Sequence, residues 1–309
     1  MEQGQLRWLP AARPLVERLG EDFFREVPRR PGVYRMYDAD GTLVYVGKAA
    51  DLRARLGSYR RTNGQSRKTI RLIHAVWRIE WDLCDSETAA RLRENELIRT
   101  LRPRFNRAGI WPKSARYVRW DAEGTRLRLS LVSEPSGEGQ YHGPFRGGPG
   151  FALAALARLA WLAWERCGVG ALPRGWIASE ALRSLELDHA RVADWTGAIR
   201  DYFAGTSDEL VARLVAEVEE PAHRFDVAYV ARQFEILESF YRAGPLRIRR
   251  LRARFGGSEP GTPTPEILDD WKILAGGESP APPFRPPESG LDDVGGMPET
   301  TTLTEARLC

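Results

Sequence analysis

Residues suited to phosphodiester hydrolysis are concentrated between positions 32 and 106. Tyr34 and Tyr45 lie eleven residues apart, in the tripeptides Gly-Val-Tyr and Tyr-Val-Gly. Two cations, Lys48 and Arg55, follow them, and the carboxylate of Glu94 comes later. Hydrolysis of a phosphodiester needs a divalent cation, a base for the attacking water and a positive group that binds the phosphate oxygens. This set contains a candidate for each of these requirements.

The two tyrosines must be positioned by secondary structure. Strand-like runs at 32–37 and 43–46 are joined by Asp-Ala-Asp-Gly, a sequence typical of a hairpin turn. Antiparallel pairing would bring the two phenols together on one face of a sheet. The Ile, Val and Trp residues between 70 and 83 predict a third strand. We therefore expect an α+β unit with a three-stranded antiparallel sheet.

Two helices are predicted to carry the charged candidates. Asp51 can N-cap a helix that runs to about residue 59 and includes Arg55. Ser86 begins a second helix, which contains Glu94 and ends near 101, before a proline. A further amphipathic helix is expected within residues 1–27, with one apolar face formed by Leu15, Val16, Leu19, Phe23 and Phe24.

In order, spacing and identity, this region resembles the GIY-YIG endonuclease family, with Val in place of Ile in both tripeptides. The likeness is closest to the N-terminal nuclease domain of UvrC and of its shorter homologue Cho, and it covers about 75 residues. The blocks that carry it are Tyr45-Val46-Gly47-Lys48-Ala49, the segment 51–59, Glu94-Asn95-Glu96-Leu97-Ile98 and Arg102-Pro103-Arg104-Phe105-Asn106.

The resemblance implies a role for each candidate. Glu94 would be the sole protein ligand of one Mg²⁺ or Mn²⁺ ion, with waters and the scissile phosphate completing the shell. Arg55 would bind the phosphate. Tyr45 or Tyr34 would orient or deprotonate the attacking water, and the choice between them stays open. A free phenol has a pKa of about 10, so Lys48 would be needed to lower it.

Two further positions match the site of the family. Tyr59 lies four residues beyond Arg55, which places it on the same face of the expected helix. Asn106 would pin the loop after the Glu94 helix against the site.

The front of the chain is strongly basic. Residues 1–120 hold 25 Lys and Arg against 14 Asp and Glu, and no acid lies between Asp51 and Glu80. Such asymmetry favours an anionic partner, of which nucleic acid is the commonest. A merely solvated basic loop is the alternative. We expect these residues to contact DNA phosphates: Arg53, Arg60, Arg61, Arg67, Lys68 and Arg71.

The chain divides into four parts by sequence. A helical extension at 1–27 precedes the nuclease domain at 28–112. A mainly helical, UvrC-like region follows at 113–255, and within it residues 194–242 resemble the helices that end in the UvrB-binding motif, which makes UvrB a candidate partner. The Pro/Gly-rich tail at 256–309 is expected to be disordered apart from a short helix at 265–274.

Several classes of protein are disfavoured. The most apolar stretch, 151–164, is too short to span a bilayer and carries Arg158, so we expect a cytoplasmic protein with no membrane partner. Three widely spaced cysteines do not suit a disulfide framework or a zinc ribbon.

The leading functional hypothesis is a metal-dependent endonuclease that makes a single-strand incision in nucleotide excision repair. One incision is expected because the second nuclease of UvrC has no counterpart here. A GIY-YIG nuclease of a recombination or mobile-element pathway is one alternative. A non-catalytic DNA- or UvrB-binding module is another, although loss of the metal ligand would be expected in a decayed site.

We predict that the purified protein contains no iron–sulfur cluster. UvrC proteins carry a cysteine cluster in the middle region, whereas Cys167 is the one cysteine there, and ordinary ligation uses four. Absorbance in the visible range and iron analysis test this, and stoichiometric iron in a brown preparation would contradict it.

Overall fold

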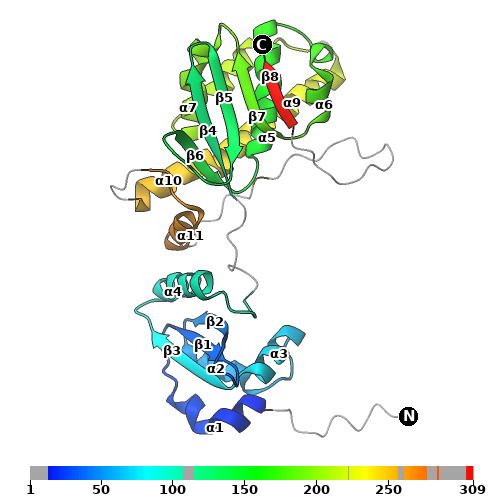
Figure 1. The fold of residues 1–309 in the computed structure, drawn as a ribbon. Coiled ribbons are helices and arrows are strands. Elements are labelled where there is room, and N and C mark those ends of the chain that lie inside the picture. The colour runs from blue at the N-terminus through cyan, green and yellow to red at the C-terminus, as the bar shows by residue number, and fades with distance from the viewer. Residues whose placement is uncertain are drawn as a thin grey trace, which may run out of the picture. The chain divides into compact units, whose positions relative to one another are not determined.

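The chain folds into two compact units, Met1–Lys113 and Ser114–Cys309 (Figure 1). The computed structural model describes residues 13–106, 115–221, 223–256, 261–276, 284 and 304–308. In the last of these ranges only the backbone is described.

The first unit is built on a three-stranded antiparallel sheet, as the sequence predicts. Its strands are β1 (Gly32–Tyr37), β2 (Leu43–Ala49) and β3 (Arg78–Leu83), in the order β2-β1-β3. Helices α1, α2 and α3 cover the face that bears Tyr34 and Met36. Helix α4 packs on the opposite face, against Val33 and Val46. Alternate residues of each strand thus serve two separate cores.

Side-chain caps begin the helices of this unit. Asp51 Oδ1 accepts a hydrogen bond of 2.9 Å from the backbone N–H of Ala54, and Ser86 Oγ accepts one of 3.1 Å from Ala89. Both caps were predicted from the sequence. The helices are α1 (Pro14–Glu26), α2 (Leu52–Gly57), the 3₁₀ turn η2 (Ser58–Arg60), α3 (Arg67–Ala75) and α4 (Glu87–Leu101).

Two features of this unit differ from the expectation. Residues 67–75 form helix α3, whereas the sequence suggested a basic loop running into a strand; Ser66 caps the helix, and Leu72 and Ile73 are buried. The second difference concerns α1, which was expected to be a separate extension. Its Leu15 and Phe24 belong to the same core as Tyr34, so the described part of the extension is integral to the first unit.

The second unit combines the expected helices with a larger sheet than predicted. A mainly helical region was expected from the sequence, and the structure adds a sheet with the strand order β6-β4-β5-β7-β8. All pairs are antiparallel except β7 with β8. The strands are β4 (Arg116–Glu123), β5 (Arg126–Val132), β6 (Gln140–Phe145), β7 (Leu182–Asp188) and β8 (Thr304–Leu308).

Helix α5, the apolar segment of the sequence, is the centre of this unit. It is buried along nearly its whole length and belongs to the same core as strands of the sheet and α9. Among the described residues, no helix is long and apolar enough to cross a membrane. The helices are α5 (Pro149–Glu165), η3 (Val169–Ala171), α6 (Arg174–Ala178), α7 (Val192–Ala204), α8 (Glu209–Glu217), α9 (Arg224–Ala243), α10 (Pro245–Phe255) and α11 (Pro265–Leu274).

The described part of the C-terminal tail is packed against the second unit, whereas composition suggested disorder. Helix α11 forms at the residues predicted, and Asp269 on it pairs with Arg146. The hydroxyl of Tyr117 donates a 3.2 Å hydrogen bond to the carbonyl of Pro263. Further along, the ring of Phe284 lies 5.8 Å from that of Phe151. Strand β8 was not expected from the sequence.

We predict that deleting residues 257–309 destabilises the second unit. The deletion removes the Asp269 partner of half-buried Arg146 and the aromatic contact of Phe284. A loss of about 2 kcal/mol lowers the unfolding midpoint of a unit of this size by roughly 4–8 °C. Differential scanning calorimetry measures this, with Arg146→Ala as the variant that isolates the ion pair. An unchanged midpoint would mean that the tail does not contribute.

Candidate active site

The tyrosines of the two tripeptides meet across the β1–β2 pair. Tyr34 lies opposite Gly47, and Tyr45 lies opposite Met36, so the phenols are diagonal neighbours with ring centroids 6.0 Å apart. A Cβ at Gly47 would lie 2.4 Å from the Tyr34 hydroxyl and 2.9 Å from the Tyr45 ring. The glycine of the second tripeptide is therefore required because both phenols approach the backbone at that point.

Tyr34, Tyr59 and Arg55 form a hydrogen-bonded group. The Tyr34 hydroxyl lies 2.9 Å from the hydroxyl of Tyr59, and Arg55 Nε donates to the Tyr34 hydroxyl over 3.2 Å. The Arg55 guanidinium also lies over the Tyr59 ring, 5.1 Å from its centroid. Arg55 comes from α2 and Tyr59 from the η2 turn that directly continues it. This short helical segment thus brings a cation and a phenol to the face of the sheet that carries the tyrosines.

The three tyrosines of the site differ in how deeply their side chains are buried. Tyr34 is fully buried, and burial raises its pKa well above the ordinary value, with the neighbouring phenols adding to the shift. Burial likewise raises the pKa of Tyr59. Both hydroxyls therefore stay protonated at neutral pH and act as hydrogen-bonding groups. Tyr45 is only half-buried, which leaves it the more accessible phenol of the site.

Glu94 projects from α4 as a half-buried carboxylate. Burial raises its pKa, while the positive charges of Lys48, Arg91 and Arg55 lower it. Of these charges Lys48 has the largest effect on the pKa of Glu94 and Arg55 the smallest. Within the described residues, no three His, Cys, Asp or Glu side chains cluster as metal ligands. A site here would suit a hard cation held by one carboxylate, with water and substrate oxygens as its other ligands.

Lys48 does not take the position expected for it. It was expected to lower the pKa of a phenol of the site, but Lys48 and Tyr45 both lie on strand β2, where an offset of three puts them on opposite faces. Lys48 Nζ instead donates to Glu87 Oε1 over 2.8 Å, at the start of α4. Its charge lowers the pKa of Glu94, against the larger rise that burial causes. Lys48 is thus a neighbour of the candidate metal ligand rather than of the phenols.

Asn106 holds the free edge of β2. Its side-chain Oδ1 accepts from the backbone N–H of Val46 at 2.9 Å, and its Nδ2 donates to the Val46 carbonyl at 2.8 Å. The preceding residue, Phe105, donates its backbone N–H to the carbonyl of Val44 over 3.0 Å. Asn106 is almost fully buried, so the segment after α4 is fixed beside Tyr45.

Comparison with known proteins places this site in a family. Residues 30–107 match the model of the UvrC-like GIY-YIG domain. This part of the chain is a GIY-YIG endonuclease domain. The match spans all seven residues of the site described above, which are Tyr34, Tyr45, Lys48, Arg55, Tyr59, Glu94 and Asn106.

Curated relatives extend the similarity beyond the domain. The UvrABC system protein C of Cronobacter sakazakii is 31% identical over 233 residues, which is 69% of this chain and 36% of that protein. That of Actinobacillus succinogenes is 41% identical over 123 residues, covering 40% of this chain and 20% of the relative. The chain thus matches 36% of the length of the first relative and 20% of that of the second.

A solved structure also matches the domain. The GIY-YIG N-terminal endonuclease domain of UvrC from Thermotoga maritima, bound to magnesium as its catalytic divalent cation, is 33% identical. The match covers 28% of this chain and 92% of that one, with a TM-score of 0.26.

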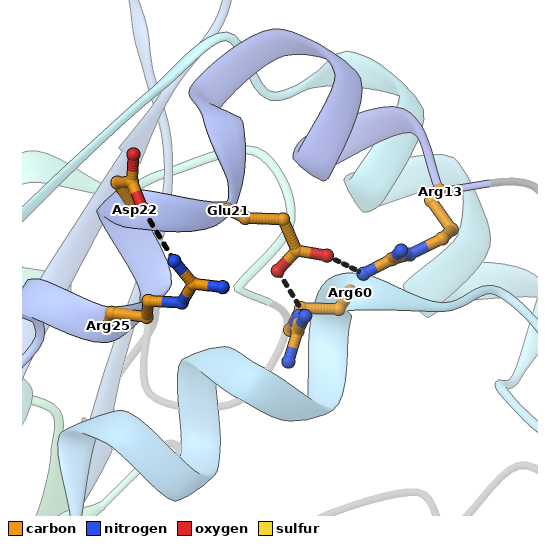
Figure 2. A network of polar contacts seen from close by, with 5 residues as sticks. All are labelled: Arg13, Glu21, Asp22, Arg25 and Arg60. Carbon is orange, nitrogen blue, oxygen red and sulfur yellow. Dashed lines mark hydrogen bonds and ion pairs between the residues drawn. The ribbon is translucent and has the colours of Figure 1, made fainter.

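Two of the residues expected to contact DNA have structural partners in the GIY-YIG domain. Arg60 pairs with Glu21 of α1, whose carboxylate lies between Arg60 and Arg13 (Figure 2). Arg53 Nε donates to the backbone carbonyl of Val27 over 2.6 Å. The sequence showed no acid near Arg60 along the chain, but folding supplies one from α1. Both residues therefore join the first helix to the remainder of the domain.

The remaining four basic residues are exposed: Arg61, Arg67, Lys68 and Arg71. Glu87, the partner of Lys48, was not recognised as a neighbour of the site from the sequence. The only available signal was its place in the first turn of the Glu94 helix, which is where an acidic residue is ordinarily explained by the helix dipole.

We predict that Asn106→Ala destabilises the GIY-YIG domain and lowers its activity through β2. The change leaves the buried N–H and carbonyl of Val46 unpaired, at a cost of about 1–3 kcal/mol for each group. Urea unfolding would measure the loss. Asn106→Asp should lose at least as much as Asn106→Ala, because its second carboxylate oxygen would face the Val46 carbonyl and its charge would be buried without a partner. Asn63→Ala, in an exposed loop, is the matched control, and an equal effect there would refute the assignment.

Proposed function

We propose that this chain is a metal-dependent DNA endonuclease that makes a single-strand incision in nucleotide excision repair. The observation that carries the proposal is the intact constellation inside a UvrC-like GIY-YIG domain. Arg55 is hydrogen-bonded to Tyr34, and its charge is one of those that lower the pKa of Glu94. One domain thus provides a cation for the phosphate, a carboxylate for the metal and the accessible phenol of Tyr45.

The carboxylate of Glu94 is the group that would hold Mg²⁺ or Mn²⁺. Its half-buried position and its single negative charge fit a hard cation that keeps several water ligands. When bound, such an ion offsets charge on the phosphate and makes a coordinated water more acidic. Lys48 and Arg91 lower the pKa of the carboxylate and so oppose the larger rise that burial causes. Lys48 is itself held in place by Glu87.

The protein side chains divide the remaining work. Arg55 binds the non-bridging oxygens of the scissile phosphate, and its hydrogen bond to Tyr34 fixes its direction. Tyr45 orients the attacking water, since it is half-buried while Tyr34 is enclosed. Tyr34 and Tyr59 stay protonated and support the guanidinium. The exposed cations Arg61, Arg67, Lys68 and Arg71 bind DNA phosphates.

UvrB is the protein partner that the similarity to UvrC suggests, through residues 194–242. In the structure this stretch contains most of α7, all of α8 and most of α9, and it exposes the apolar side chains of Val215, Phe225 and Val227. Exposed apolar residues on helices suit a docking surface. A pull-down with UvrB separates excision repair from recombination or mobile-element cleavage.

We predict that Glu94→Gln abolishes strand cleavage while leaving the fold and DNA affinity largely intact. The amide keeps the volume of the carboxylate but loses the charge that binds the cation. A plasmid-nicking assay with and without Mg²⁺ tests both the residue and the metal requirement. Cleavage at near the original rate in saturating Mg²⁺ would overturn the assignment. A wild-type chain that cuts no DNA would favour a non-catalytic binding module.

Arg55→Ala should lower the rate of cleavage by a factor of about 10²–10³ and DNA affinity much less. A positive group fixed on the scissile phosphate stabilises charge that develops in the transition state. Single-turnover cleavage and binding to uncleavable DNA separate the two effects. Arg61→Ala is the control, because an exposed phosphate contact should weaken binding without a further loss of rate. If Arg55→Ala reduces affinity as far as turnover, Arg55 is an ordinary backbone contact.

A further inference from the structure

A cationic hollow lies on the GIY-YIG domain at the segment that closes the edge of β2. It has a volume of about 470 Å³ and is lined by Arg67, Lys68 and Arg71 of α3 and by Arg104 and Phe105. Four cations thus share a hollow with one aromatic ring and no acidic residue. Its volume lies in the range of sites that hold a small organic group.

The positive charge of the hollow is largely uncompensated. Arg104 pairs with Asp38 at 3.1 Å, and its guanidinium lies 5.5 Å from the centre of the Phe105 ring. Arg67, Lys68 and Arg71 form no ion pair with any other residue that the structure describes. All three are exposed. An anion would therefore find three cations that no internal carboxylate neutralises.

Phe105 connects this hollow to the active site. Its backbone N–H donates to the carbonyl of Val44, next to Tyr45 on β2, and Asn106 beside it binds Val46. The ring is only half-buried, with its covered part against the core of the domain. The position of the ring is thus set by the same bonds that fix the strand carrying Tyr45.

Phosphate binding by the cations does not account for the aromatic ring of Phe105 in the hollow. In duplex DNA the faces of the bases are covered by their neighbours, so a ring inside a hollow cannot stack on them. An unpaired base exposes its face, and stacking on an aromatic side chain binds it without regard to sequence. Resting on the proposed nuclease function, we propose that this hollow binds one unpaired nucleotide of the substrate strand next to the cleavage site.

In this arrangement the base enters between the Arg104 guanidinium and the Phe105 ring and stacks on both, while Arg67, Lys68 and Arg71 bind the adjoining phosphates. The enzyme therefore prefers DNA with an unpaired segment at the cut over continuous duplex. This preference is a property of the GIY-YIG domain itself and needs no partner protein.

Binding to the full chain carrying Glu94→Gln tests the proposal without cleavage. Fluorescence anisotropy gives the Kd for a short single strand and for a duplex of the same length, with and without Phe105→Leu. Leucine keeps the apolar contact with the core and the backbone bond to Val44. We expect Phe105→Leu to weaken single-strand binding about tenfold, the size of one base–aromatic contact, and duplex binding less than twofold.

Two controls make the result specific. Lys68→Ala should weaken the single strand and the duplex alike and reduce the salt dependence of both, as loss of a phosphate contact does. An abasic nucleotide moved along the single strand should, at one position, make Phe105→Leu harmless. Nucleoside monophosphate should compete for the hollow better than inorganic phosphate at equal ionic strength.

Equal losses on both DNAs, or no loss with Phe105→Leu, would overturn the proposal, as would equal competition by inorganic phosphate. Unchanged duplex binding in Phe105→Leu also shows that the variant is folded. The nuclease function fails separately, if the wild-type chain cuts no DNA while the binding differences persist.

Discussion

Strand β2 is an edge strand, and its outer backbone groups are satisfied by the segment that follows α4. The Asn106 side chain makes both hydrogen bonds that a neighbouring strand would make to Val46, and Phe105 bonds to Val44. An open edge would be free to shift or to pair with another chain. Because β2 carries Tyr45 on one face and Lys48 on the other, its position sets both halves of the site. The positions of Tyr45 and Lys48, and that of Phe105 in the cationic hollow, all depend on the bonds that Asn106 and Phe105 make to this edge.

The site uses the two faces of a thin sheet. Tyr34, Tyr59 and Arg55 form a hydrogen-bonded group on the face covered by α2, while Glu94 comes from α4 on the other. The absence of a side chain at Gly47 lets the phenols approach the backbone of the edge strand. The Arg55 charge is one of those that lower the pKa of Glu94, which comes from the other face of the sheet. A wider sheet, or a larger residue at that position, would separate the groups.

The basic character of the domain has two distinct physical origins. Some arginines stabilise the domain through contacts within it: Arg60 pairs with Glu21 (Figure 2), and Arg53 donates to the backbone carbonyl of Val27. Others, such as Arg67 and Arg71, are exposed on α3 and form no ion pair among the described residues, so they are available to bind an anion. The second unit shows the same internal use, because buried Arg158 donates to Gln233 and to the carbonyl of Trp176. A count of positive residues therefore overstates the surface available to DNA.

The sequence by itself determined the three-stranded sheet and two of the capped helices of the first unit, and it indicated the residues of the proposed site. Hairpin chemistry, the Asp51 and Ser86 caps and the order of the motif blocks are local properties, readable over a few residues. Tertiary structure alone decided which cations are free, because the partner of Arg60 lies 39 positions away on another helix. It also decided the face on which Lys48 lies, the packing of Phe284 and the meeting of α3 with Phe105. Those outcomes depend on contacts between segments that are distant in the sequence, and patterns over a few residues do not predict such contacts.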